Sequence, residues 1–530
     1  MKSKKTEHDQ SEYKSKKHRY RTQTKIFVNL KQRFVNFFSY WTKKSFKKQR
    51  NWIDLDNASK LFPSVMNSTD TKVFRFTATI KDDIDPELLQ MALDQAYRHF
   101  PLYRGVLRRG IFWYYYEESD LHPVVQEEKD YPCRSLFHYD EKQLLFRVLY
   151  YRNRIHLEVF HALSDGTGAS WFLQLLITNY ILLRYPESMS PRIELSEEFQ
   201  QQLYKFGSQL DDSFERYFHK GKNEKSINKN KRSLNKPEKR KWKRVHHIHG
   251  LRTQDNRMQI IESEMPVKEL LQLAKQRNVT LSVLLTAIFI ESIHKTVKHK
   301  NKEHSVTISV SINLRQFYPS HSARNFFATT LIGYTFGQEG KTDTLDEICE
   351  CVAEQYSVSV KVENIERKLY ALVKLEKNLA LRIIVRPVKN LILRLANVIN
   401  NLTITAALSN MGKISFPQNI EEYVNQIYVY ITASRPQFAC ITHKDVLTIN
   451  FSSPYQDTEI QMNFLRRLTE IGIPVTIAAN EVNPPEVKPK EDQFTAKNRE
   501  KTDKVSREKS DTINDPDNYY KQQETEHEIL

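Results

Sequence analysis

Apolar and polar residues recur along the middle of the chain with two periods, and each period predicts one type of element. Alternation at every second position predicts strands, whereas apolar residues spaced three and four apart predict helices. Strands are expected at residues 72–80, 111–118, 143–151, 154–160, 256–266, 305–315, 403–417, 437–445 and 446–454. Helices are expected at residues 85–100, 168–185, 267–297 (with a break at Asn278) and 456–472.

These strands and helices alternate in two similar halves, which predicts an α/β body with two layers in each half. The chain is therefore expected to divide into five segments. They are a disordered basic N-terminus with an amphipathic helix (1–51), an N-terminal half (52–204), a basic linker or insert (205–245), a C-terminal half (246–480) and a disordered tail (481–530).

The positive charge of the chain is concentrated in two of these segments. The formal net charge is +17, and residues 1–50 carry sixteen Lys or Arg against three acidic residues. Residues 220–252 carry thirteen against two, so the remainder of the chain is acidic by seven charges. The charge is accompanied by no recognised nucleic-acid-binding module, and we expect no nucleic-acid partner.

Residues 25–48 combine this charge with an apolar face at helical spacing. The face consists of Phe27, Leu30, Phe34, Phe38 and Trp41, among seven lysines and arginines. A basic helix with an aromatic face is typical of a segment that lies on an anionic membrane surface. A helix that docks on the protein's own body has the same periodicity, and the two interpretations have equal weight.

The composition indicates a cytoplasmic protein. No apolar run reaches the ~18–20 residues that span a bilayer, and no secretory signal is expected at the basic N-terminus. The four cysteines are interpreted as reduced thiols. We expect the protein either free in the cytoplasm or held through 25–48 at the inner face of the cytoplasmic membrane. No oligomeric state is predicted.

The stretch FHALSDGTGAS (160–170) directly follows a predicted strand and carries the best candidate chemistry. His161 stands at the strand end, where a tight turn can expose one ring nitrogen and fix the tautomer through a local contact. Asp165, four residues later, can point inward and hold an arginine. Gly166 and Gly168 allow a close approach that a Cβ atom would block.

Further stretches combine with this motif into a resemblance. They are WIDLDNASKLFPS (52–64), RHFPLYRGVLRRGIFWYYYEES (98–119), SINLRQFYPSHSARNFF (311–327) and LSNMGKISFP (408–417). With the H-x-x-x-D-G motif, they resemble the chloramphenicol-acetyltransferase-like superfamily over roughly residues 52–480, and most closely its bacterial alcohol acetyltransferase-like members. The resemblance implies two α/β halves, each a mixed sheet with flanking helices, around a central tunnel.

The resemblance also implies roles for individual residues. His161 matches the general base that takes a proton from the acceptor as the acceptor attacks an acyl thioester. Asp165 matches the structural aspartate, followed by Gly166 of the motif. Arg315 matches the arginine paired with that aspartate, and Arg324 is the reserve candidate.

Ser409 and Asn410 lie on a strand that faces the tunnel in relatives, where they would donate hydrogen bonds near the oxyanion. The chain departs from peptide condensation domains, which carry two adjacent histidines, because Phe160 occupies the first position. The D-F-G-W-G motif of plant BAHD acyltransferases is absent too. These departures argue against peptide condensation, not against acyl transfer.

The implied reaction uses acyl-CoA as cosubstrate and a hydroxyl, or else an amine, as acceptor. It needs no bound cofactor and no metal, and the HHIH stretch (246–249) lacks the Cys or acidic residue that would complete a zinc site. Two other classes remain open: a non-catalytic condensation-like protein that binds an acyl group or a carrier, and a basic membrane-surface adaptor. The basic amphipathic stretch 379–398 is a candidate for covering the acceptor tunnel, for touching lipid or for packing on the body as a helix, and the last interpretation is favoured.

Overall fold

The protein is described from a computed structural model that covers seven stretches of the chain. They are residues 52–139, 141–186, 210–219, 242–253, 256–300, 302–377 and 384–480. The predictions for residues 1–51 and 481–530, and for most of 187–241, lie outside the described residues.

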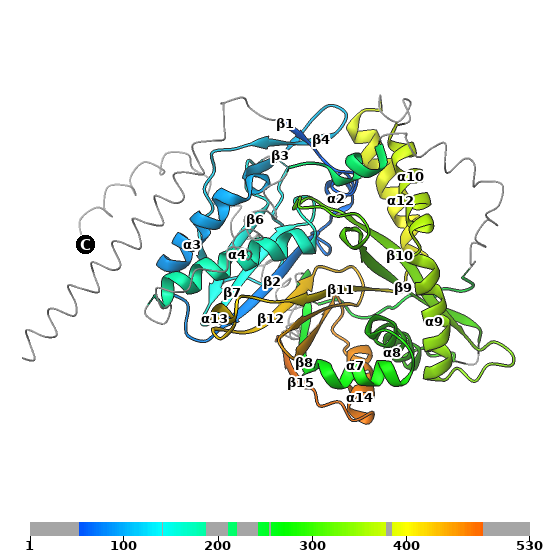
Figure 1. Ribbon diagram of the computed structural model, residues 1–530. Helices are drawn as coiled ribbons and strands as arrows, with labels where there is room; N and C mark the ends of the chain where they lie inside the picture. Colours follow the sequence, from blue (N-terminus) through cyan, green and yellow to red (C-terminus); the bar gives the residue numbers. More distant parts are fainter. Residues whose placement is uncertain are drawn as a thin grey trace, which may run out of the picture. The chain divides into compact units, whose positions relative to one another are not determined.

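The first sheet has five strands and a layer of two helices on one face. Its order is β12 (Val424–Ile431), β2 (Val73–Ile80), β7 (Arg154–Phe160), β6 (Phe146–Tyr151) and β5 (Gln126–Glu127). The helices α3 (Pro86–His99) and α4 (Gly166–Arg184) lie side by side on it (Figure 1). Their buried faces and the inward side chains of β2 and β7 form one apolar core.

The second sheet has seven strands and is mixed. Its order is β10 (Phe327–Phe336), β9 (His304–Asn313), β11 (Ala406–Ile414), β13 (Gln437–His443), β14 (Val446–Ser453), β8 (Gln259–Pro266) and β15 (Thr476–Ala479). Strand β11 runs parallel to both of its neighbours, and the other pairs are antiparallel. A second apolar core lies between this sheet and helices α7 (Val267–Gln276), α8 (Leu281–Lys295), α9 (Leu345–Ser359) and α14 (Glu459–Glu470).

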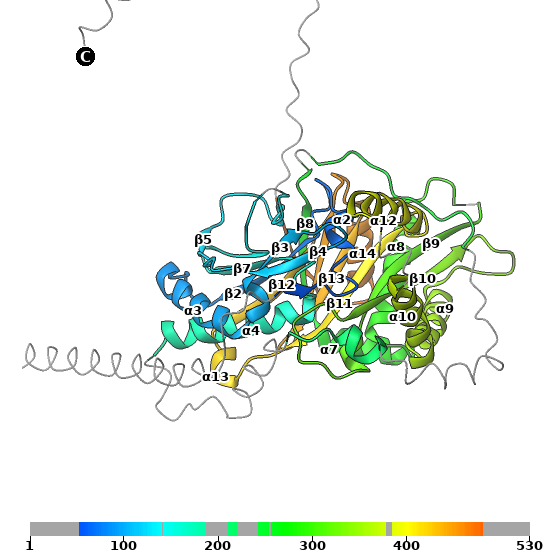
Figure 2. The ribbon, with the colours of Figure 1, turned by 90° about the horizontal axis from the view of Figure 1, so that it is seen from above.

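The remaining elements are short or lie outside the two layers. A three-stranded sheet contains β1 (Trp52–Asp54), β4 (Tyr114–Glu118) and β3 (Gly105–Arg109). The other helices are α2 (Phe62–Val65), α10 (Val362–Lys377), α12 (Arg386–Asn401) and α13 (Gln418–Glu421), with short 3-10 or π turns at Pro101–Arg104, Glu215–His219 and Leu314–Gln316. Helix α12 lies beside α2 (Figure 2).

Local sequence explains where several elements begin. Asp85 caps α3, because its carboxylate accepts hydrogen bonds from the backbone of Glu87 and Leu88. Asn278 separates α7 from α8 with a φ of 55°, a conformation that asparagine tolerates better than most residues. The predicted break at this position is confirmed.

Most of the predicted strands and helices are present with shifted ends. Among the described strands, however, one strand of the predicted C-terminal half belongs to the first sheet. Strand β12 belongs by sequence to the predicted C-terminal half, yet it pairs with β2 at the edge of the first sheet. The two sheets are therefore not built from two consecutive stretches of chain. Within the described residues, we find no helix with the length and apolarity needed to cross a bilayer.

Candidate active site

His161 lies at the point where strand β7 ends. Its backbone N–H donates to the carbonyl oxygen of Lys72 (2.7 Å), and a turn closes behind it from Leu163 N to Phe160 O (2.8 Å). The imidazole stacks on the Phe62 ring with 4.4 Å between ring centroids. Two more aromatic rings, those of Phe74 and Phe327, have centroids 5.1 and 5.3 Å away. The side chain is therefore enclosed by rings but remains partly exposed.

One ring nitrogen of His161 is occupied and the other is available. Nδ1 lies 3.1 Å from Asn325 Oδ1, which accepts a hydrogen bond when Nδ1 carries the proton. Nε2 makes no hydrogen bond to any residue that the structure describes. Burial lowers the pKa of His161, although its hydrogen bonds and the charge of Asp165 act in the opposite direction. The ring is thus neutral near pH 7, with a lone pair on Nε2.

Asp165 holds the backbone that follows the histidine. Its Oδ1 accepts from Gly168 N (2.9 Å) and so caps α4, and its Oδ2 accepts from Phe326 N (2.8 Å). Arg315 Nη1 donates to the same Oδ2 (2.7 Å), and both side chains are more than 90% buried. The predicted pair between Asp165 and Arg315 is confirmed. It connects the first sheet's loop to the end of β9.

Close packing requires the second glycine of the motif, Gly168, and places the first, Gly166, against a flexible side chain. A Cβ atom on Gly166 would stand 2.2 Å from Met411 Cε, and one on Gly168 would stand 2.3 Å from the Ala323 carbonyl oxygen. The second contact is with backbone, which cannot move aside as a flexible side chain can. Gly166 therefore lets β11 approach the start of α4.

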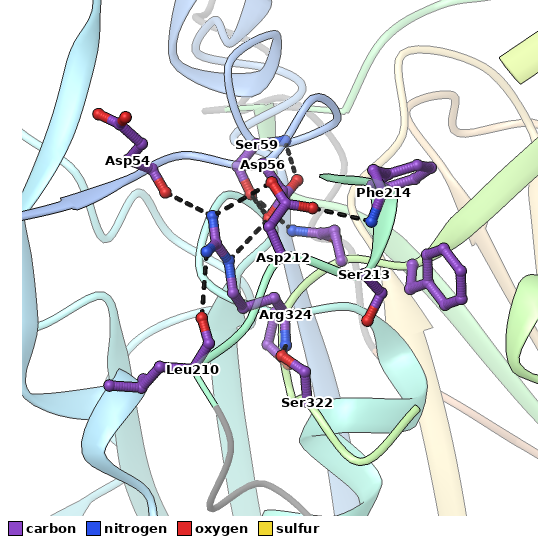
Figure 3. A network of polar contacts seen from close by, with 12 residues as sticks. Asp54, Asp56, Ser59, Leu210, Asp212, Ser213, Phe214, Ser322 and Arg324 are labelled. Carbon is purple, nitrogen blue, oxygen red and sulfur yellow. Dashed lines mark hydrogen bonds and ion pairs between the residues drawn. The ribbon is translucent and has the colours of Figure 1, made fainter. Parts of the chain in front are cut away.

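Arg324, the reserve candidate, is engaged elsewhere. Its guanidinium lies between two carboxylates, 3.8 Å from Asp56 Oδ2 and 3.7 Å from Asp212 Oδ2 (Figure 3). It also donates to the carbonyl oxygens of Asp54 and Leu210. Burial raises the pKa of Asp56 to about 6, although the nearby Arg324 charge acts to lower it. Arg324 thus joins β1 and segment 210–219 to the loop after Arg315.

Buried hydrogen bonds through Ser59 and Asn325 connect this network with His161. The sequence did not predict this connection. Asn325 Nδ2 donates to Ser59 Oγ (2.9 Å) and to the carbonyl oxygen of His161 (2.9 Å). The Ser59 hydroxyl lies 2.6 Å from both Asp56 Oδ2 and the Ala162 carbonyl oxygen. Asn325 therefore fixes the backbone and the ring of His161 together. The only sequence signal was its position in the ARNFF stretch of the resemblance.

Ser409 and Asn410 on β11 form their hydrogen bonds with residues other than His161. Ser409 Oγ lies 3.0 Å from the hydroxyl of Ser311 on the neighbouring strand β9. Asn410 Nδ2 donates to Ser282 Oγ (3.0 Å), and its Oδ1 accepts from Gly412 N (2.9 Å). The structure thus brings His161, Asp165, Gly166 and Arg315 together and leaves the oxyanion roles of Ser409 and Asn410 as predictions.

The assembled groups suit proton transfer. A neutral imidazole with one oriented and one available nitrogen can accept a proton from a hydroxyl or amine. Among the residues that the structure describes, no cluster of three or more His, Cys, Asp or Glu is arranged to hold a metal ion.

Comparisons with known proteins find likeness in structure alone. No protein-family model and no curated protein sequence matches the chain. Trichothecene 15-O-acetyltransferase TRI3 of Fusarium sporotrichioides has a TM-score of 0.51 at 10% identity, over 80% of this chain and 94% of that chain.

The enzyme TRI101, solved with coenzyme A and T-2 mycotoxin, is similar at the same level. The protein of F. graminearum has a TM-score of 0.50 at 10% identity, over 79% of this chain and 97% of its own. The protein of F. sporotrichioides has a TM-score of 0.50 at 12% identity, over 82% and 100%. The chain therefore has the two-domain α/β fold of the chloramphenicol-acetyltransferase-like acyltransferases.

Proposed function

We propose that this protein is an acyl-CoA-dependent O-acyltransferase, similar in activity to alcohol acetyltransferases, that moves an acyl group, with acetyl as the favoured candidate, from acyl-CoA onto a hydroxyl. The observation that carries the proposal is the state of His161: a neutral ring, fixed through Nδ1 by Asn325, with Nε2 available in a partly exposed position. The fold adds support, because TRI3 is named as an O-acetyltransferase.

The reaction follows from these groups in two steps. Nε2 of His161 takes the hydroxyl proton while the acceptor oxygen attacks the thioester carbonyl carbon, which gives a tetrahedral oxyanion. The carbon–sulfur bond then breaks, and the CoA sulfur leaves with the proton from the imidazolium. The products are the O-acyl ester and free CoA thiol. The protein supplies positioning and proton transfer, since the thioester is already activated.

Asp165 and Arg315 act on this site as positioning residues. Neither touches the imidazole through a hydrogen bond; both hold the loop between β7 and α4 that presents it.

Ser409 is the better of the two proposed oxyanion donors. Its hydroxyl forms a hydrogen bond with the Ser311 hydroxyl and a weaker one with the Met411 sulfur at 3.8 Å. Rotation of the Ser409 side chain can exchange these bonds for one to an oxyanion. The Asn410 amide is already held from both sides.

The test is release of CoA thiol from acetyl-CoA in the presence of a panel of alcohols, with matched amines and an acceptor-free control, and detection of the product by mass spectrometry. We expect thiol release that depends on a hydroxyl acceptor and yields an ester 42 mass units heavier than the alcohol, the mass that the chemistry of O-acetylation adds. Binding of acetyl-CoA without thiol release for any acceptor would favour the non-catalytic condensation-like protein instead.

A further inference from the structure

Helix α12 is attached to the body by its polar side. Asn390 accepts from Ser64 Oγ (2.8 Å) and donates to the Tyr114 hydroxyl (3.1 Å), and Arg394 Nε donates to the Ser64 carbonyl oxygen (2.8 Å). Lys389 is buried and donates to the Phe112 carbonyl oxygen (3.1 Å). These contacts join α12 to α2 and to the β3–β4 turn. Polar residues thus occupy the face where a helix in a soluble protein usually places apolar ones.

The opposite side of α12 is apolar and exposed. Its large side chains recur three and four positions apart, which places them on one face of the helix. They are Val388, Leu391, Ile392, Leu395, Val398, Ile399 and Leu402, with exposed fractions between 43% and 67%. The expectation that the 379–398 stretch packs on the body is therefore wrong for the apolar face of α12, since it is the polar face that does so.

The turn between β3 and β4 extends this exposed surface. Arg386 N, at the start of α12, donates to the Ile111 carbonyl oxygen (2.9 Å), so the turn lies beside the helix end. Ile111 and Phe112 are themselves exposed. We call the seven apolar residues of α12 and these two the apolar face of α12. Exposed apolar side chains gathered on one helix face in this number mark an interaction site.

Charge indicates what covers this face. Helix α12 carries Arg386, Lys389 and Arg394 and no acidic residue, and residues 109–113 and 62–65 add Arg109 and no acidic residue. The N-terminal segment 25–48 would bring like charge to it, and so would the same face of a second copy of the chain. An anionic bilayer offers acyl chains for the apolar side chains and negative headgroups for Arg394, which is the exposed cation of α12.

We propose that the apolar face of α12 lies in the interface of a bilayer that contains anionic phospholipid. Helix α2 then connects the bilayer with the site, because it contacts α12 through Ser64 and stacks Phe62 on the His161 ring. The acceptor class that fits this position is a hydroxyl compound resident in the bilayer, and this last step rests on the proposed function.

The test compares full-length variants for sedimentation with vesicles of phosphatidylcholine alone and of phosphatidylcholine mixed with phosphatidylglycerol. Leu395→Glu/Ile399→Glu places two charges on the apolar face. The matched control, Leu271→Glu/Met462→Glu, changes two exposed apolar residues on α7 and α14. We expect the wild type and the control to bind the mixed vesicles, and the α12 variant to lose at least about tenfold in partition coefficient.

Undiminished binding by the α12 variant would overturn the proposal and leave residues 25–48 as the membrane segment. A wild-type dimer in gel filtration that the α12 variant converts to a monomer, with no vesicle binding by either, would assign the face to a second copy. Thiol release with a water-soluble alcohol is measured in parallel. We expect equal rates of thiol release in the wild type, the control and the α12 variant, with vesicle binding lost only in the α12 variant. This result would show that the face binds the bilayer and is not needed for the reaction itself.

Discussion

The protonation state of one imidazole decides whether this site can act near neutral pH. Burial among aromatic rings lowers the pKa of His161, and the direction is favourable because a general base must be neutral before it accepts a proton. The same enclosure limits the ring to one orientation. Residue-scale chemistry here is thus set by neighbours that lie far away in the sequence.

The pH profile of kcat/KM should reflect this pKa. Activity rises with pH as the imidazole of the free enzyme loses its proton, so the acid limb should have its midpoint below ~6.5, the ordinary histidine value. The rate should already exceed half of its plateau at pH 7. Initial rates of thiol release in buffers of constant ionic strength measure it, and a midpoint above 7 would contradict the lowered pKa.

Asn325→Ala tests the orientation of the ring. The variant removes the hydrogen bond to Nδ1, which favours the charged form of His161, so the pKa should fall further and the acid limb should move to lower pH. We expect kcat to fall about tenfold, which corresponds to one lost hydrogen bond of ~1.4 kcal/mol. A variant with a lower melting temperature but an unshifted pH profile would show a merely structural role.

Sequence reasoning reached the residues that form a contiguous motif and failed for those that do not. His161 and Asp165 stand four apart, and their spacing after a strand is visible in the chain. Ser59 and Asn325 touch across 266 positions, and an isolated Ser or Asn carries no periodicity that marks it. The pairing of Asp165 with Arg315 rather than Arg324 rested on the resemblance and was decided by the geometry.

At the scale of elements, one carboxylate at the junction of β7 and α4, that of Asp165, makes three structural interactions. Asp165 caps the helix, accepts from the backbone at Phe326 and neutralises a buried arginine. The loop that presents His161 is consequently held from the helix side and from the second sheet. We therefore expect the proposed activity and the stability of the fold to depend on the same residue.

Asp165→Asn should unfold at lower temperature as well as lose activity. The amide leaves the Arg315 charge without its partner in a buried site, which costs ~3–5 kcal/mol. Combined with Arg315→Met, an apolar replacement of similar length, the double variant should cost clearly less than the sum of the single ones. Denaturant titrations of the four proteins measure this coupling. Simple additivity would show that the pair contributes no interaction energy.

Element prediction worked where polar and apolar residues alternate in the sequence and failed where the letters show neither period. Strand β12 is buried at six of its eight positions, yet it begins with the polar residues Asn425 and Gln426 after Val424, so its letters show no clear period. Its partner β2 lies about 350 residues earlier, which no local pattern reports. For α12 the limit is a different one. Its helical periodicity was visible in the sequence, but the sequence could not show that the apolar face points away from the body.

At the scale of the whole molecule, two features connect the two sheets: strand β12, which comes from the later part of the chain, and an ion pair between β7 and β8. Besides β12, Arg154 of β7 donates through both terminal nitrogens to Glu262 of β8 (2.7 and 3.0 Å). The Tyr430 hydroxyl on β12 donates to the same carboxylate. The first sheet thus contains a strand of the later chain and an ion pair to the second sheet, so we expect the described body to unfold as one unit.

Glu262→Ala should therefore lower the melting temperature without splitting the transition. The loss leaves Arg154 and Tyr430 without their shared acceptor, and because Arg154 is partly exposed the cost should be ~1–3 kcal/mol. Lys268→Ala, which removes a pair with Asp445 that is about three-quarters exposed, is the matched control and should cost under ~0.5 kcal/mol. Two separate calorimetric transitions in Glu262→Ala would mean that the sheets unfold independently.

The central claim is that His161 Nε2 takes the acceptor proton, and a matched pair of variants measures it most directly. His161→Gln makes its substitution directly after β7 and His156→Gln makes the same substitution within β7, where the His156 ring lies beside Glu128 in a separate polar cluster. Transfer of labelled acetyl from CoA to a hydroxyl acceptor is followed for both. The account predicts a loss of ~10²–10⁴-fold for His161→Gln and under about threefold for His156→Gln. Equal rates in the two variants would contradict it.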